Sequence, residues 1–149
     1  MTMRYYLAYG SNLNIQQMQT RCPSAKPVGS VPLDGYELLF RGRNGSAVAT
    51  IEPKVGGVVP CGLWLITDKD EASLDCYEGF PHFYRKEMIP VRFGRRNMKV
   101  MAYVMNDGHA LAMPGIGYLR TILDGYKDFG LDLSALDAAL EVSTSAEDK

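Results

Sequence analysis

The chain has 149 residues, which is enough for one domain with a sizeable buried core. Its hydrophobic fraction of 46% and charged fraction of 22% are ordinary for a soluble globular protein, and a formal net charge of −1 gives no electrostatic argument for nucleic acid binding. It contains no run of about 18 apolar residues that could span a membrane, and its first residues lack the apolar segment of a secretory signal. We therefore expect a cytoplasmic protein that binds neither nucleic acid nor membrane.

The beginning of the chain predicts a strand, a turn and a short helix. Residues 5–8 form an apolar run typical of a strand, and the glycine-containing turn of residues 9–13 follows it directly. A helix is expected from Asn14 to Cys22, because Asn14 can cap its N-terminus and Gln17 stands at the reciprocal position of a capping box.

The middle of the chain predicts further short strands and a second helix. Residues 35–40, 47–51 and 62–66 are apolar runs separated by Gly, Pro and Asn, and each is typical of a strand. A helix is expected from Asp68 to about Tyr77, with Glu71 in the capping-box position.

Residues 83–93 and 98–105 predict a β-hairpin, with an exposed turn over residues 94–97 between them. Pro90 lies inside the first arm and lacks a backbone donor, which indicates an edge strand or a bulge.

The last third of the chain predicts two helices. The longer one is expected over residues 116–129 with Gly130 as its C-terminal cap, and a short one over residues 134–142. We predict the apolar face of the longer helix to consist of Ile116, Leu119, Leu123 and Tyr126. Residues 143–149 are expected to form a polar, disordered tail.

This order of elements favours a single α+β domain over residues 1–142, built on a curved or closed, mostly antiparallel sheet. We find no internal repeat and no linker that would divide the chain.

The turn of residues 9–13 is the first candidate for a site. A strand that turns into a helix leaves backbone N–H groups without helical partners, and such groups can hold a carboxylate or an oxyanion. The alternative is a plain connection in which Gly10 allows a tight turn and Asn12 caps the helix. A Walker-type phosphate loop is excluded, and Ser11 lacks a neighbouring His that would activate it as a nucleophile.

Glu78 is the second candidate. A carboxylate near a helix C-terminus faces the negative end of the helix dipole, so it is badly placed for a purely stabilising acid. The aromatic neighbours Tyr77, Phe80 and Phe83 would desolvate Glu78, raise its pKa and make it a better general base near neutral pH. The alternative is an exposed loop acid or a partner of Arg85.

Cys22, Cys61 and Cys76 are odd in number and show no CxxC spacing, which predicts reduced thiols and no zinc site. His82 follows Glu78 by four residues, but the Gly and Pro between them disfavour a helical metal pair. A nucleophilic pair of Cys76 and His82 is conceivable, yet nothing in the spacing singles it out.

Several segments together resemble the γ-glutamylcyclotransferase-like family, which includes the AIG2-like proteins and γ-glutamylamine cyclotransferases. They are the turn of residues 9–13, the Leu-Asp-x-x-Glu-Gly pattern of residues 74–79, the strand of residues 102–105 and the segment of residues 114–130. The resemblance extends from Tyr5 to about Leu133 and keeps the order of the elements.

The resemblance implies a small β-barrel flanked by helices, with one pocket beside the glycine turn. It also implies a reaction in which the α-amine of a γ-glutamyl group attacks its own γ-carbonyl and releases 5-oxoproline, without metal or cofactor. Glu78 matches the catalytic glutamate of the family. The residues that the resemblance implies in substrate binding are Tyr9, Gly10, Ser11, Asn12, Leu13, Tyr103 and Tyr118. The expected partner is a small γ-glutamyl compound, and the expected state is a monomer or homodimer.

Two alternatives stay open at this point. The amine that leaves could come from a γ-glutamyl dipeptide, from γ-glutamyl-ε-lysine or another γ-glutamylamine, or from a γ-glutamyl-protected metabolite. The domain could also be a non-catalytic module that binds a small acidic ligand in the same pocket.

Overall fold

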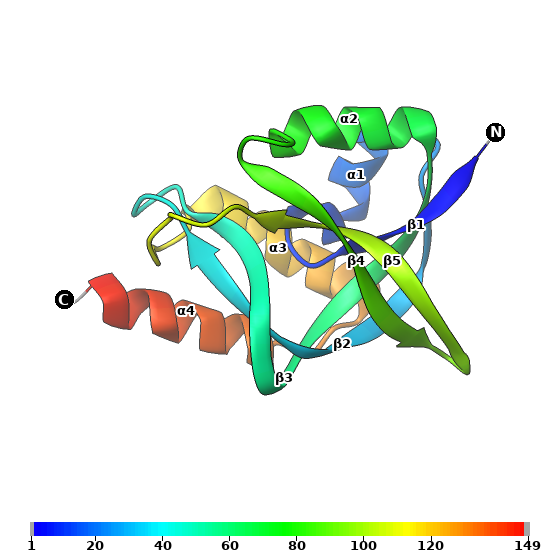
Figure 1. Cartoon of the computed structure of the whole chain (residues 1–149). Coiled ribbons are helices and arrows are strands. Elements are labelled where there is room, and N and C mark those ends of the chain that lie inside the picture. The colour runs from blue at the N-terminus through cyan, green and yellow to red at the C-terminus, as the bar shows by residue number, and fades with distance from the viewer. Residues whose placement is uncertain (1, 148–149) are drawn as a thin grey trace.

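The fold is a curved mixed sheet with helices packed around it, as the computed structural model shows for residues 2–147 (Figure 1). In chain order, the elements are β1 (Met3–Ala8), the 3₁₀ helix η1 (Ser11–Leu13), α1 (Ile15–Arg21), β2 (Lys26–Arg41), β3 (Val48–Thr67), α2 (Asp68–Glu78), β4 (Tyr84–Phe93), β5 (Arg96–Met105), α3 (Ile116–Phe129) and α4 (Ser134–Glu147). The α+β class expected from the sequence is confirmed.

The five strands are ordered β2-β3-β1-β5-β4. All neighbours are antiparallel except β1 and β5, which run parallel with Tyr6 opposite Met101. The edge strands β2 and β4 curl towards each other, so that a Cβ atom on Gly29 would lie 3.3 Å from the ring of Phe93. No ladder joins these edges within residues 2–147, and the expected barrel is therefore incompletely closed.

The hairpin of β2 and β3 is much longer than the sequence pattern predicts. The separate runs over residues 35–40, 47–51 and 62–66 belong to two strands of 16 and 20 residues. The Gly and Pro residues between those runs do not end the strands, because the register shift between Asp34 and Tyr36 absorbs extra residues of β3 in a bulge. The β4–β5 hairpin is confirmed, and Pro90 lies on an edge strand, where its missing N–H costs no ladder bond to a further strand.

The caps explain where the first helices begin. Asn14 caps α1 as expected, and its side chain accepts a hydrogen bond from the Gln17 N–H at 3.0 Å. In α2 the capping box is formed by Thr67 and Asp70, not by Asp68 and Glu71, so the cap lies one residue earlier than predicted.

The bounds of α3 and its Gly130 cap are as predicted, and so is the packing of Leu119 and Tyr126 on the core, but Ile116 and Leu123 are exposed. Ile116 is 77% exposed, and the residues of α3 that are buried are Ile122, Gly125 and Tyr126. The prediction for the end of the chain is wrong for residues 143–147, because α4 continues to Glu147 and Ser143 is buried. Residues 148–149 of the predicted tail lie outside the described residues.

The packing of η1 fixes the position of the turn that follows β1. Leu13 is fully buried between β3 and α3. Glycines make this possible on both sides, because a Cβ on Gly62 would lie 2.8 Å from the Leu13 side chain and one on Gly125 would lie 2.6 Å from Leu13 Cβ. The turn is therefore held between a strand and a helix with no room for a larger side chain.

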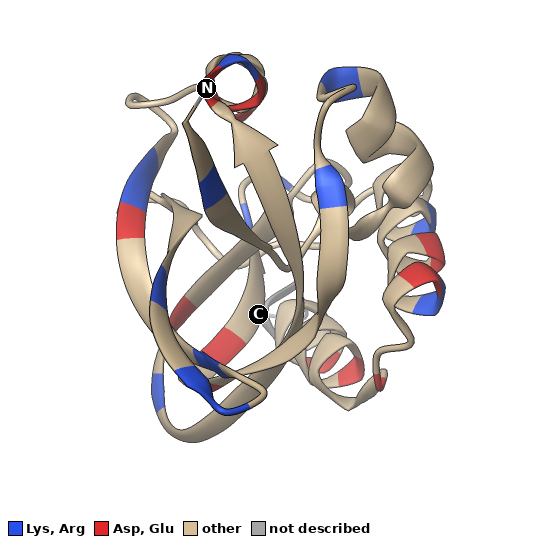
Figure 2. Ribbon diagram, turned by 90° about the vertical axis from the view of Figure 1, so that its right-hand side faces the viewer, with Lys and Arg blue, Asp and Glu red and all other residues tan. Residues whose placement is uncertain are grey.

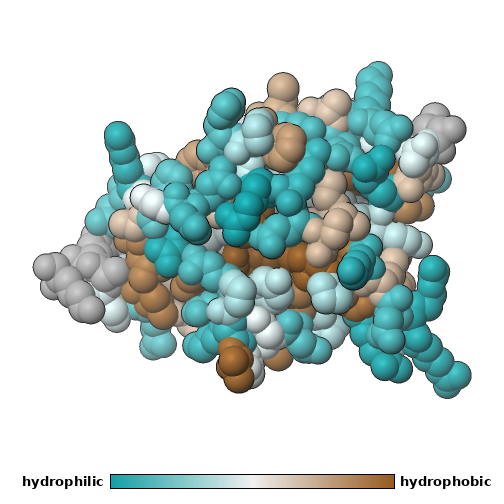
Figure 3. Space-filling model, in the orientation of Figure 1, coloured by the Kyte–Doolittle hydropathy of each residue, from teal (hydrophilic) through white to brown (hydrophobic). Residues whose placement is uncertain are grey.

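The surface carries charges of both signs, which are interspersed in the view of Figure 2. The face in Figure 3 shows hydrophobic residues gathered in a band across the middle, between hydrophilic side chains above and below. None of the helices within residues 2–147 is long and apolar enough to cross a membrane.

The glycine contacts around Leu13 give a direct test of the packing. We expect Gly125→Ala to lower the free energy of unfolding by about 1–3 kcal/mol in urea denaturation, because the added methyl group overlaps Leu13 and the Asn14 backbone. Gly117→Ala on the same helix is the matched control, since a Cβ there meets nothing within 4 Å, and it should be neutral or stabilising by up to about 1 kcal/mol. Equal stability of the two variants would contradict this account of the fold.

Candidate active site

A pocket of about 430 Å³ opens beside the turn that follows β1. Its walls come from β1 and the turn after it, η1, the start of β3, the end of α2 and the loop after it, the start of β4, β5 and α3. The lining residues are Tyr6, Tyr9, Gly10, Ser11, Asn12, Val48, Ala49, Cys76, Tyr77, Glu78, Gly79, Phe83, Tyr84, Tyr103 and Tyr118.

The glycine turn forms one wall with its backbone. The carbonyls of Gly10 and Ser11 accept the first bonds of the 3₁₀ turn, from the N–H groups of Leu13 and Asn14 at 3.0 Å. Within the described chain, the N–H groups of Ser11 and Asn12 donate to no protein acceptor, as expected at the start of a helical turn. They are available to an anionic group in the pocket.

Gly10 has little space for a side chain at this wall. A Cβ there would lie 3.2 Å from the Ala49 side chain and 3.4 Å from the hydroxyl of Tyr118. That hydroxyl accepts a hydrogen bond from the Ala49 N–H at 2.9 Å, which leaves its own proton to point elsewhere. The backbone N–H groups of the turn and the hydroxyl of Tyr118 are thus neighbouring hydrogen-bond donors.

The Asn12 side chain is buried and fully engaged. Its Nδ2 donates to the hydroxyl of Tyr6 at 2.9 Å and to Glu78 Oε1 at 3.3 Å, and its Oδ1 accepts from Arg21 at 2.6 Å. Its backbone carbonyl accepts from the indole of Trp64 at 3.0 Å. Asn12 therefore faces the pocket with its backbone, while its side chain connects the turn to Glu78.

Glu78 is the last residue of α2 and contacts this turn through the Asn12 side chain. Gly79 follows it in the left-handed conformation, with φ of 65°, so the helix ends abruptly and leaves the carboxyl group at the pocket. Burial raises the pKa of Glu78 to about 7, although the Arg21 guanidinium lowers it in part. The desolvation expected from the sequence is present, and Arg85 pairs with Glu87 instead of Glu78.

The tyrosines of the pocket place hydroxyl groups on an otherwise largely apolar wall. Tyr9 donates to the Tyr103 carbonyl and Tyr84 donates to the Ala49 carbonyl, both at 2.6 Å. Burial raises the pKa of Tyr9 and Tyr84 above the usual value, so both keep their protons near neutral pH.

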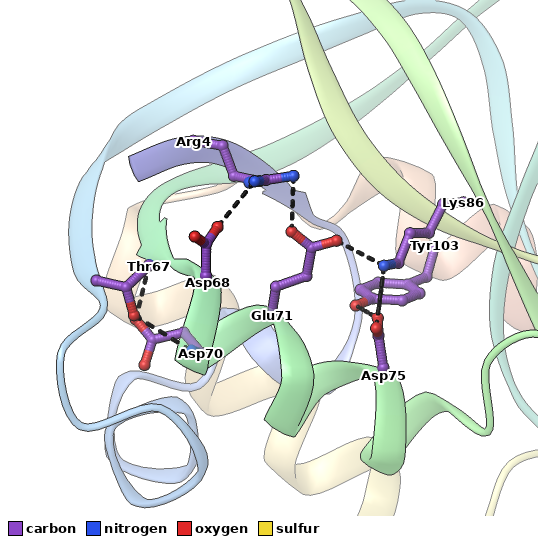
Figure 4. Close-up of polar contacts among 8 residues, drawn as sticks. All are labelled: Arg4, Thr67, Asp68, Asp70, Glu71, Asp75, Lys86 and Tyr103. Carbon is purple, nitrogen blue, oxygen red and sulfur yellow. Dashed lines mark hydrogen bonds and ion pairs between the residues drawn. The ribbon is translucent and has the colours of Figure 1, made fainter. Parts of the chain in front are cut away.

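Asp75 and Lys86 fix the end of α2 against the sheet (Figure 4). Tyr103 on β5 donates to Asp75 at 2.6 Å, and Lys86 on β4 pairs with Asp75 at 2.9 Å and also with Glu71. Arg4 on β1 continues the network towards the start of the helix by pairing with Glu71 at 2.9 Å. The Tyr103 hydroxyl is therefore occupied, and this residue contributes its ring to the pocket.

The structure brings together every residue predicted for the site except Leu13, which belongs to the core under the turn. The sequence reasoning missed Tyr6, Tyr84 and Ala49 in the wall and Arg21 behind it. Apolar alternation places Tyr6 in β1 but cannot tell which pocket it faces, and no spacing connects Arg21 with Glu78.

The remaining reactive side chains form no second centre. Cys22 and Cys61 are buried free thiols, and Cys76 is exposed at the pocket without a histidine partner in the described residues. His109 stacks on Phe83 with ring centroids 4.9 Å apart. Within residues 2–147, no group of three or more His, Cys, Asp or Glu residues could hold a metal ion.

The fold and the site define the class: an α+β domain with one small pocket lined by a buried carboxyl group, several tyrosines and the backbone of a glycine turn. The chain belongs to the gamma-glutamyl cyclotransferase, AIG2-like family, whose model matches residues 6–119. The family resemblance noted in the sequence is thereby confirmed.

Solved structures of similar fold support this membership. A protein titled gamma-glutamyl cyclotransferase matches with a TM-score of 0.80 and 24% identity, over 98% of this chain and 87% of that one. A human protein titled uncharacterized protein loc79017 matches with a TM-score of 0.81 and 25% identity, over 99% and 88% of the two chains. A mouse AIG2-like protein is more distant, with a TM-score of 0.62 and 15% identity over 80% and 84%. No curated protein matches the sequence.

The buried carboxyl group of Glu78 makes stability depend on pH. Its pKa is raised by folding from an ordinary value near 4.5 to about 7, so its ionisation costs stability as the pH rises through this window. We expect Glu78→Gln to be about as stable as wild type below pH 4.5 and more stable above pH 7, by about 1–3 kcal/mol in urea unfolding. Glu141→Gln, which removes an exposed carboxyl group on α4, is the control. A constant difference between wild type and Glu78→Gln across this range would mean that Glu78 is not desolvated.

Proposed function

We propose that the protein is a γ-glutamylcyclotransferase in which Glu78 acts as general base and then as general acid. The α-amine nitrogen of the γ-glutamyl substrate attacks the γ-carbonyl carbon, and the new C–N bond closes the ring of 5-oxoproline. The C–N bond to the leaving amine breaks. The substrate ammonium loses one proton before it attacks and a second one after the ring bond has formed. Glu78 takes protons from the attacking nitrogen and passes them to the leaving nitrogen, which departs as an ammonium, so no net proton is consumed.

The observation that carries this proposal is the buried carboxyl group of Glu78, which lines the same pocket as Ser11 and Asn12 and is hydrogen-bonded to the Asn12 side chain. An α-amino group has an ordinary pKa near 8 and is mostly protonated at neutral pH, so it needs a base before it can attack. A carboxyl group with a pKa of about 7 accepts that proton and can also give it back.

The rest of the pocket suits the binding of a flexible glutamyl arm. Cyclisation is intramolecular, and its rate depends on holding the amine close to the carbonyl carbon. The backbone amides of Ser11 and Asn12, with the hydroxyl of Tyr118 beside them, would hold the substrate carboxylate or the oxyanion that forms at the γ-carbonyl. The rings of Tyr9 and Tyr103 would enclose the arm. Membership of the cyclotransferase family supports the same assignment.

Loss of the base should abolish turnover. We expect Glu78→Gln to lower kcat for release of 5-oxoproline by about 10²–10⁴-fold, because the amide keeps the size and polarity of the carboxyl group but cannot accept the proton. For the wild type, kcat should rise with pH through about 7, as Glu78 loses its proton. Both are measured by mass spectrometry of 5-oxoproline formed from a panel of γ-glutamyl dipeptides and γ-glutamylamines.

A folded Glu78→Gln protein with near-normal turnover would rule out this role. If the wild type turns over none of the panel but binds an acidic ligand, the pocket is a binding module instead of an active site. Equilibrium binding of free 5-oxoproline and glutamate to both proteins separates these results.

The close backbone approach at Gly10 gives a test of substrate binding. We expect Gly10→Val to raise KM by about tenfold or more, equivalent to about 1.4 kcal/mol, because its side chain displaces Ala49 or the Tyr118 hydroxyl from the turn. Gly117→Val, at the exposed start of α3, should leave KM unchanged, since a Cβ there meets nothing within 4 Å. Unchanged kinetics in a folded Gly10→Val protein would remove the turn from the binding site.

A further inference from the structure

Arg21 lies behind the pocket wall, at the end of α1. Its Nη1 donates to Asn12 Oδ1 at 2.6 Å, and its Nη2 donates to Gln17 Oε1 at 2.7 Å. Its outer side borders a separate groove between α1 and α3. Arg21 is therefore held in a fixed position without forming part of the substrate pocket.

The bond from Arg21 determines which way the Asn12 side chain points. A carboxamide has an acceptor at one end and donors at the other. Because the acceptor Oδ1 faces Arg21, the donor Nδ2 must face the opposite way, where it meets Tyr6 and Glu78 Oε1. Asn12 as a whole is 2% exposed, so water cannot easily replace Arg21 or Glu78 as its hydrogen-bond partner. By fixing the orientation of Asn12, Arg21 directs the Nδ2 donor of Asn12 towards the Glu78 carboxyl group.

Arg21 also contacts the helix that carries Glu78. Its Cζ lies 3.7 Å from the centre of the Tyr77 ring, a cation–π arrangement. Tyr77 precedes Glu78 directly, and its hydroxyl is hydrogen-bonded to Ser11 Oγ at 3.0 Å. The end of α2 is in this way joined to both α1 and the glycine turn.

Arg21 places a positive charge near Glu78, whose other neighbours in the pocket are neutral side chains. The ionisable groups around Glu78 are Tyr6 on β1, Tyr9 in the turn after β1, Cys76 and Tyr77 on α2, Tyr84 on β4, Tyr103 on β5, Tyr118 on α3 and Arg21 on α1. Burial raises the pKa of Tyr6, Tyr9, Tyr84, Tyr103 and Tyr118, so these five hydroxyl groups are uncharged near pH 7. The guanidinium of Arg21 is always protonated and opposes the effect of burial on Glu78.

We propose that Arg21 is a positioning residue for the cyclisation, which orients the Asn12 carboxamide towards Glu78 and supplies the positive charge that favours the proton-accepting carboxylate. This inference rests on the proposed function, in which Glu78 is the base. The same charge favours the return of the proton to the leaving nitrogen, because it makes the protonated carboxyl group a stronger acid. Arg21 acts in both steps through Asn12 and the local field, without touching the substrate.

The test is the pH dependence of turnover in Arg21→Gln. Glutamine can still donate to Asn12 but carries no charge. We expect the acidic limb of kcat to move up by about one pH unit, so that kcat falls about tenfold below pH 7 and recovers towards wild type at pH 9. KM should change less than kcat, since Arg21 does not line the substrate pocket. Arg21→Lys, which keeps the charge, should leave the limb within a few tenths of a unit.

Arg120→Gln is the matched control, because Arg120 borders the groove on the outer side of Arg21 and is exposed on α3. Its kcat profile should superimpose on that of the wild type. The amine of the substrate titrates equally in all variants, so a shift between them reports the enzyme.

A second measurement needs no activity. The side-chain carboxyl carbon of Glu78 is followed by ¹³C NMR against pH, with its signal assigned by its loss in Glu78→Gln. We expect its pKa to be higher in Arg21→Gln than in the wild type, and close to wild type in Arg120→Gln.

A kcat that falls by the same factor at every pH, or a Glu78 titration that does not move in Arg21→Gln, would overturn the proposal and leave Arg21 a structural residue. Absence of 5-oxoproline from the wild type would instead refute the proposed function, and the NMR titration would still decide whether Arg21 acts on Glu78. If Arg21→Gln does not fold, Arg21→Met combined with the same titration replaces it.

Discussion

Leu13 is enclosed by β3 on one side and α3 on the other, and this enclosure is the constraint on which the active-site geometry depends. Gly62 and Gly125 bring the two elements so close that a single methyl group on either would overlap the Leu13 side chain or its neighbour. Because the turn cannot shift, the amides of Ser11 and Asn12 keep their direction before any ligand arrives. Such preorganisation is what makes backbone donors effective against a developing negative charge.

The pocket contains few charged side chains, and this determines its electrostatics. Glu78 is the ionisable acid of the wall, and protonated tyrosines face it. In the proposed reaction, a negatively charged substrate is received by dipoles instead of by a cation inside the pocket. The cation, Arg21, is kept behind Asn12, where it can act on Glu78 without forming an ion pair with the substrate carboxylate. The proposed mechanism thus assigns binding of the anion and tuning of the base to different residues.

The sequence predicted those features that depend on local chemistry. The bounds of α3 followed from apolar periodicity and Gly130, and the desolvation of Glu78 followed from its aromatic neighbours. What it could not predict depends on contacts between distant segments: the long β2–β3 hairpin, whose Gly and Pro residues are absorbed by pairing and a bulge, and the burial of Ser143, which extends α4 beyond its expected end. Arg21 was missed for the same reason, since only the folded chain brings α1 to the end of α2.

The indole of Trp64 donates to the carbonyl of Asn12, and Trp64 is the only tryptophan in the chain. Its emission therefore comes from one fully buried ring attached directly to the turn that faces the pocket. A ligand held by the Asn12 N–H binds the peptide unit next to the one whose carbonyl accepts from this ring. We therefore expect the emission of Trp64 to report occupancy of the pocket beside this turn, whether or not the chemistry follows.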